Sequence, residues 1–192
     1  MKSKNKYSNK VNKNNKNEQF NSSANWIIKI TSMAFFLSLA LSFTSDTVIP
    51  NVPIYISTLL LIIFVVIGIV FDMIGVSVTV AQTKIFNSMA SKKVRGAKTA
   101  LLMIKNKSKV SSFCNDVIGD VCGVISGATG IGISTTISSA LSINLIIVNL
   151  IITSLIASIT IGGKALGKGY AINKANKILF HFARFIEIIT FK

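Results

Sequence analysis

The sequence predicts an all-α integral membrane protein with about four transmembrane helices, a basic amphipathic cytoplasmic loop and a C-terminal juxtamembrane helix. Long apolar stretches without charge alternate with segments that hold nearly all the basic residues. The chain of 192 residues is 51% hydrophobic, its mean hydropathy is +0.62, and its formal net charge is +15. A basic soluble protein carries its charge on a wet surface and is less apolar than this. The composition therefore argues against nucleic acid as a partner.

The N-terminal residues 1–25 form a low-complexity tract of Lys, Asn and Ser. Little in this tract can be buried, so we expect a disordered cytoplasmic tail, with weak attraction to anionic lipid as an alternative role. The remaining residues, 26–192, form the predicted transmembrane domain. Its first span covers about residues 26–44, where Trp26 suits the headgroup level and Lys29 can snorkel to the same interface.

The second span, about residues 54–81, is the strongest transmembrane signal in the chain. Its residues from Ile54 to Phe71 carry no charge, and Asp72 follows them. A carboxylate at the centre of a membrane helix costs about 2.5–3.5 kcal/mol on insertion scales. Asp72 is therefore a candidate functional residue, or an interfacial carboxylate that pairs with a nearby Lys.

The segment 84–110 is basic and amphipathic. Apolar residues recur there at steps of three and four, which predicts helix, with a break near residues 91–93 that makes two helices. We expect this cytoplasmic loop to cover the membrane surface. Its basic residues are Lys84, Lys92, Lys93, Arg95, Lys98, Lys105, Lys107 and Lys109.

The third span, about residues 115–136, is only moderately apolar. Gly119, Gly123 and Gly127 lie four residues apart, so they share one face of a helix, against which a neighbouring helix could pack closely. Asp116 and Asp120 lie in the same stretch. Two interpretations stay open: a small-residue packing face, or a glycine-broken helix that lines an ion site.

The fourth span, about residues 143–161, carries no charge and leads into a juxtamembrane helix at about 170–190. In that helix an apolar stripe is flanked by basic residues, which is typical of an interfacial helix. Basic residues fill 1–25, 84–110 and 164–184. The positive-inside rule then predicts a multi-pass protein of the cell membrane with both termini in the cytoplasm.

No catalytic constellation is visible, so we do not expect an enzyme. His181 has no acidic or nucleophilic neighbour at catalytic spacing, and Cys114 and Cys122 match no metal or redox motif. The remaining chemistry lies in carboxylate, amide and hydroxyl oxygens near the spans. Such oxygens suit hard cations such as magnesium. The hypothetical metal-ligating residues are Asp72, Ser77, Asn115 and Asp120.

Three motifs follow one another in this order: VRGAKTALLMIKNKSKVSSF, then VIGDVCGVISG, then GGKALGKGYAINKANKI. Together they resemble the transmembrane domain of the CNNM/CorB/CorC family over about residues 54–189, without that family's CBS domains. The resemblance implies magnesium or cobalt transport and a homodimer. Gly163, Lys168 and Ala171 match the family pattern, whereas Lys164 stands where the family has a cation-binding Glu.

The sequence therefore supports three hypotheses for function. The first is divalent-cation transport or homeostasis, with magnesium or cobalt as substrate. The second is a diverged, non-transporting membrane interaction protein that binds lipid or another membrane subunit, which the Lys at position 164 favours. The third is a small pore-forming protein, although a pore does not need the long basic loop between its spans.

Overall fold

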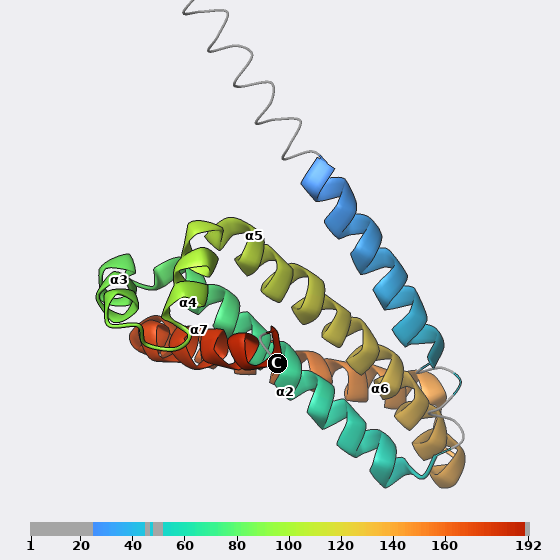
Figure 1. Cartoon of the computed structure of the whole chain (residues 1–192). Coiled ribbons are helices and arrows are strands. Elements are labelled where there is room, and N and C mark those ends of the chain that lie inside the picture. Colours follow the sequence, from blue (N-terminus) through green and yellow to red (C-terminus); the bar gives the residue numbers. More distant parts are fainter. Residues whose placement is uncertain (1–24, 45–46, 48–51, 191–192) are drawn as a thin grey trace, which may run out of the picture. The chain divides into compact units, whose positions relative to one another are not determined.

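The computed structural model describes residues 25–44, 47 and 52–190 (Figure 1). Every regular element in these ranges is a helix, and four helices are long and apolar enough to cross a membrane. The all-α, multi-pass prediction is thereby confirmed. The first of the four helices comprises Asn25–Thr44. The predicted disordered tail lies outside the described residues, apart from Asn25, with which this helix begins.

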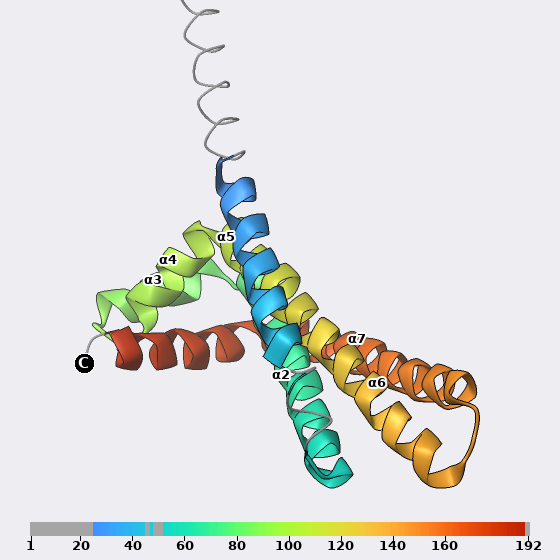
Figure 2. The ribbon, with the colours of Figure 1, turned by 90° about the vertical axis from the view of Figure 1, so that its right-hand side faces the viewer.

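The described residues from Ile54 to Thr190 form a bundle of three long helices with a layer of short helices at one end (Figures 1 and 2). In chain order its elements are α2 (Ile54–Val80), α3 (Thr83–Ser91), α4 (Ala97–Lys105), α5 (Lys107–Ser112), the π-helix η2 (Phe113–Gly119), α6 (Asp120–Leu141) and α7 (Leu145–Thr190).

Helix α2 agrees with the predicted second span to within one residue. It begins directly after Pro53, whose fixed φ suits a helix start, and ends where Ala81 turns to an extended conformation. Its 27 residues make a rod of about 40 Å, longer than the hydrocarbon thickness of about 30 Å. Helix α2 is therefore long enough to cross a bilayer with some tilt.

The basic loop folds into two short helices, as predicted, because the chain turns between Ser91 and Ala97. Lys93 and Gly96 both have positive φ in this turn, at 56° and 88°. The left-handed conformation is incompatible with continuing a right-handed helix, so α3 ends and α4 starts in a new direction. Beyond α4, the helix α5 runs directly into η2 and α6.

The third long helix spans Lys107–Leu141, so it starts earlier than the predicted span at 115. The predicted glycine face is also wrong in part. A Cβ on Gly123 or Gly127 would meet nothing within 4 Å, whereas one on Gly130 would run into Ile156 of α7. Most faces of α6 carry apolar or small residues. Composition alone therefore does not show which of these faces is buried.

Helix α7 joins the predicted fourth span and the predicted juxtamembrane helix into one element of 46 residues. The GGKALGKGY stretch between them contains glycine but no proline, so no hydrogen bond of the helix is lost there. The only non-helical backbone angles in α7 occur at Lys174, where the helix kinks. Figure 2 shows the part after the kink running in a different direction from the part before it.

The bundle is tightest at the end that carries the short helices. We call α3, α4, α5 and the part of α7 from Lys174 onward the basic layer. Its core joins residues from four elements of the chain to the end of α2. These core residues are Ile74, Val78, Phe86, Ala100, Met103, Cys114, Leu179 and Ala183. The layer is therefore a packed part of the fold and not a loose loop.

Candidate functional site at a three-helix junction

Asp72 is the one charged side chain among the buried residues of the described bundle, with 4% of the residue exposed. It lies between Gly68 and Gly75 on α2, at steps of four and three residues, so all three share one helix face. Gly68 packs against Cys122 of α6, and Gly75 packs against Asn115 of η2. The two glycines bring α2 close to the third helix, and this close approach removes Asp72 from solvent.

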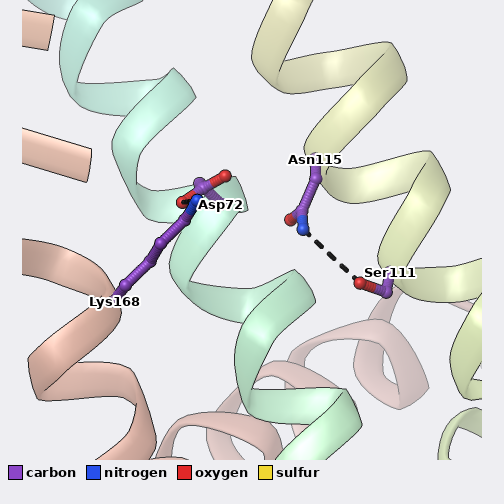
Figure 3. Close-up of polar contacts among 4 residues, drawn as sticks. All are labelled: Asp72, Ser111, Asn115 and Lys168. Atoms are coloured by element: carbon purple, nitrogen blue, oxygen red, sulfur yellow. Dashed lines mark hydrogen bonds and ion pairs between the residues drawn. The ribbon is translucent and has the colours of Figure 1, made fainter. Parts of the chain in front are cut away.

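Lys168 of α7 supplies the countercharge for Asp72. Its Nζ lies 3.7 Å from Asp72 Oδ2, with the Lys side chain 52% exposed and the Asp side chain 6% exposed. Figure 3 shows the Lys168 side chain extending from α7 to the carboxylate on α2. The distance is that of an ion pair and exceeds that of a hydrogen bond, and Oδ2 has no hydrogen-bond partner among the described residues.

Asn115 approaches α2 from η2. A Cβ on Gly75 would overlap Asn115 Oδ1, so the amide occupies the space that a side chain at position 75 would fill. Its Nδ2 donates to Ser111 Oγ at 3.4 Å, while its buried Oδ1 has no hydrogen-bond partner in the described parts of the chain (Figure 3). π-Helical turns often mark functional positions, and here one sets the position of Asn115.

Lys164 lies one turn before Lys168. Its side chain extends to the third helix and not to Asp72. Its Nζ would be 3.6 Å from a Cβ on Gly119, beside the buried Cys122. The α7 backbone is close to α2 at this level, because Cβ atoms on Gly163 and Gly167 would meet Ile69 and Met73. Two ammonium groups from one helix therefore enter the junction, one on each side.

The remaining predicted ligands do not join Asp72. Asp120 and Asp116 are exposed. Asp120 is the first of the 22 residues of α6, so it lies about 32 Å from the far end of that helix. Ser77 is fully buried, and its hydroxyl donates to the Met73 carbonyl oxygen at 2.8 Å. The predicted set of Asp72, Asp120, Asn115 and Ser77 is therefore not assembled around one point.

The electrostatics of the junction disfavour a bound cation. Within the described ranges, no group of three or more His, Cys, Asp or Glu side chains could hold a metal ion. A divalent cation beside Asp72 would have to displace Lys168 and would feel the charge of Lys164 as well. We call Asp72, Ser111, Asn115, Lys164 and Lys168 the polar junction.

Sequence reasoning identified Asp72, Asn115 and Lys164 as site residues but missed Lys168 as the partner of Asp72. Depth along the helices does not distinguish Lys168 from Lys164. At 1.5 Å per residue, Asp72 lies about 27 Å from the start of α2, whereas Lys164 and Lys168 lie about 29 Å and about 35 Å from the start of α7. A long Lys side chain can cover either difference in depth.

Comparison with protein-family models, with curated proteins and with solved structures finds no match to this chain.

Proposed function

We propose that the protein is a non-transporting membrane interaction protein that has a CNNM/CorB-type transmembrane domain, with a lysine in the place of the cation. The observation that carries this proposal is the ion pair between Lys168 and the buried Asp72. A tethered ammonium already neutralises the one buried carboxylate, so the site needs no metal for charge balance. We also propose that the basic layer and both termini face the cytoplasm, as the distribution of basic residues predicts.

The direct test is metal flux. We expect proteoliposomes with the wild-type protein to pass no more Mg²⁺ or Co²⁺ than empty liposomes. Flux in the wild type that disappears in Asp72→Asn would overturn the proposal, because it would show that the carboxylate serves a moving cation despite its lysine.

A second test uses thermal unfolding of the purified protein. Lys168→Met leaves Asp72 buried without a partner, and we expect a loss of about 1–2 kcal/mol, less than for a fully buried pair because Lys168 is half exposed. Millimolar Mg²⁺ should restore part of this loss, whereas it should not stabilise the wild type. Lys177→Met, an exposed lysine of the same helix, is the matched control and should show neither effect.

Divalent-cation transport is the second candidate function. It is favoured by two buried oxygens without hydrogen-bond partners among the described residues, Asp72 Oδ2 and Asn115 Oδ1, which a hard cation could use as ligands. In that case Lys168 would act as a gate that leaves Asp72 when the cation enters. Lys168→Met should then increase flux, whereas under the first proposal it lowers stability and makes stability respond to metal, without any flux.

A further inference from the structure

The basic layer concentrates positive charge on exposed side chains. All eight basic residues of the segment 84–110 are exposed, and so are Lys174, Lys177 and Arg184 of α7. Glu187 is the one carboxylate among the described residues of the layer. Unlike most basic surfaces of folded proteins, this one is not interspersed with acidic residues, so its countercharge must come from outside the layer.

The turn between α3 and α4 is held against α7. Glu187 accepts a hydrogen bond from the backbone N–H of Gly96, and a Cβ on Gly96 would lie 3.0 Å from both the N and the Cα of Arg184. The turn itself carries Lys92, Lys93 and Arg95, and Figures 1 and 2 show α3 and α4 beside the end of α7. We call Lys92, Lys93, Arg95 and Arg184 the turn cluster.

The turn cluster holds four cations, whereas the described layer holds one carboxylate, so the cluster keeps an excess of positive charge. Glu187 accepts the hydrogen bond from Gly96, and no ion pair joins it to the four cations among the described residues. An excess of exposed positive charge attracts anions. Arg and Lys side chains are suited to bind the oxygens of a phosphate group.

Large apolar side chains are exposed beside these cations. Phe185 and Ile188 of α7 are 59% and 52% exposed, and Leu102 of α4 is 62% exposed. A surface that combines basic residues with exposed aromatic and aliphatic ones is typical of the membrane interface, where apolar groups enter the acyl boundary and cations meet headgroups. A free phosphate would leave these apolar groups in water.

The length of the helices places the layer at the correct depth. From Leu145 to the kink at Lys174, α7 is about 44 Å long, which exceeds the hydrocarbon thickness by about 14 Å. We therefore expect the part of α7 after the kink to lie near the headgroups. There it can run along the surface, with its exposed apolar side chains toward the acyl boundary.

We propose that the turn cluster binds the phosphate of an anionic phospholipid headgroup, with Phe185 and Ile188 in contact with the acyl chains. The inference rests on the proposed interaction function and deepens it by naming the ligand. It uses no residue of the polar junction. A protein that proved to transport Mg²⁺ would therefore end the first proposal and leave this one standing.

The test compares lipid retention by the full-length protein. Wild type is reconstituted in nanodiscs of equal parts phosphatidylcholine and phosphatidylglycerol, and the lipid that stays bound after extraction is measured by native mass spectrometry. We expect enrichment of phosphatidylglycerol and a higher thermal midpoint than in phosphatidylcholine alone. Inorganic phosphate added to the phosphatidylcholine nanodiscs separates a headgroup from a free anion as the ligand, and we expect it to produce no such shift.

The variant that removes the site is the quadruple change Lys92→Gln, Lys93→Gln, Arg95→Gln and Arg184→Gln. Its matched control removes the same charge elsewhere in the layer. That control changes Lys84, Lys105, Lys107 and Lys109 to Gln. We expect the first variant to lose phosphatidylglycerol enrichment roughly tenfold and the control to keep most of it. Circular dichroism of both variants checks that the helices persist.

Three outcomes overturn the proposal. The first is equal retention of the two lipids by the wild type. The second is an equal loss in both variants, which would mean that net charge and not the turn cluster attracts the lipid. The third is stabilisation by inorganic phosphate equal to that by phosphatidylglycerol.

Discussion

The two parts of α7, before and after the kink at Lys174, are built on different principles. Before the kink the helix is apolar except around Lys164 and Lys168, and large residues such as Ile146, Leu150 and Leu155 are at least 60% exposed. A buried stripe at four-residue steps starts with Gly167 and Ala171 and continues after the kink through Ala175, Leu179 and Ala183, and the last two belong to the core shared with the short helices. The first part depends on lipid for its surroundings, and the second part makes its own core. The residues that α7 contributes to the hydrophobic core therefore lie in the basic layer.

The strongest test of this contrast makes the same substitution, Leu to Ala, once in each part of the helix. Leu179→Ala removes a side chain with no exposed surface, and we expect a loss of about 2–5 kcal/mol in the free energy of unfolding. Leu155→Ala, at 60% exposure, exchanges a contact with lipid for another contact with lipid and should change stability by less than about 1 kcal/mol. Denaturant titration in micelles measures both, and similar losses at the two positions would refute the contrast.

A second test compares two glycines that the sequence does not distinguish. In Gly75→Ala the new Cβ overlaps Asn115 Oδ1, and we expect a loss of about 1–3 kcal/mol as the amide is pushed aside. In Gly123→Ala nothing lies within 4 Å, so better helix propensity should stabilise the protein by up to about 1 kcal/mol. Thermal midpoints of the two variants should move in opposite directions. A large loss in Gly123→Ala would show that the exposed face of α6 is covered by a partner.

A third test addresses the turn that fixes the basic layer to α7. Gly96→Ala places a side chain at φ 88° and 3.0 Å from the Arg184 backbone, and we expect a loss of about 1–2 kcal/mol. Gly169→Ala, in an open helical position of α7, should be neutral or slightly stabilising. Hydrogen exchange of the α3 and α4 amides should rise in Gly96→Ala only. Unchanged exchange would mean that the turn does not anchor these helices.

The smallest expected effect comes from the carboxylate in the same turn. Glu187→Gln keeps an oxygen for the Gly96 N–H but removes its charge, which should cost about 0.5–1 kcal/mol in unfolding free energy. Asp116→Asn is the control, since Asp116 is an exposed carboxylate outside this turn. Equal shifts in thermal midpoint for both variants would point to net charge and not to the hydrogen bond.

Much of the fold could be predicted from local pattern alone. Hydropathy predicted the four long helices, and helical spacing with a basic break predicted α3 and α4. The continuity of α7 was missed because glycine weakens a helix without forcing it to end. The prediction that Gly123 and Gly127 form a packing face failed because α6 presents small residues on several faces, and only a neighbour can select one.

The candidate site was predictable only in its residue types. Lys164 and Lys168 are one turn apart on the same helix, so the sequence cannot show which of them pairs with Asp72. That choice depends on how α7 is positioned along α2, which is set by the contacts of Gly163 and Gly167 with Ile69 and Met73. Such a register is a property of two packed surfaces and has no signature in either helix by itself.

The π-helix η2 changes which residues lie on the same face of the third helix before and after it. At α-helical pitch, two residues eight positions apart are about 80° out of phase. The wider turns of η2 take up this difference, so that Cys114 and Cys122 are both buried toward α2, the first against Ile74 and Val78 and the second against Gly68. If the same residues formed an ordinary α-helix throughout, α5 would be rotated by about 100° relative to α6. The extra residue therefore sets the rotation of α5 relative to α6 about the helix axis. One continuous helix can then pack against the membrane bundle at one end and against the basic layer at the other.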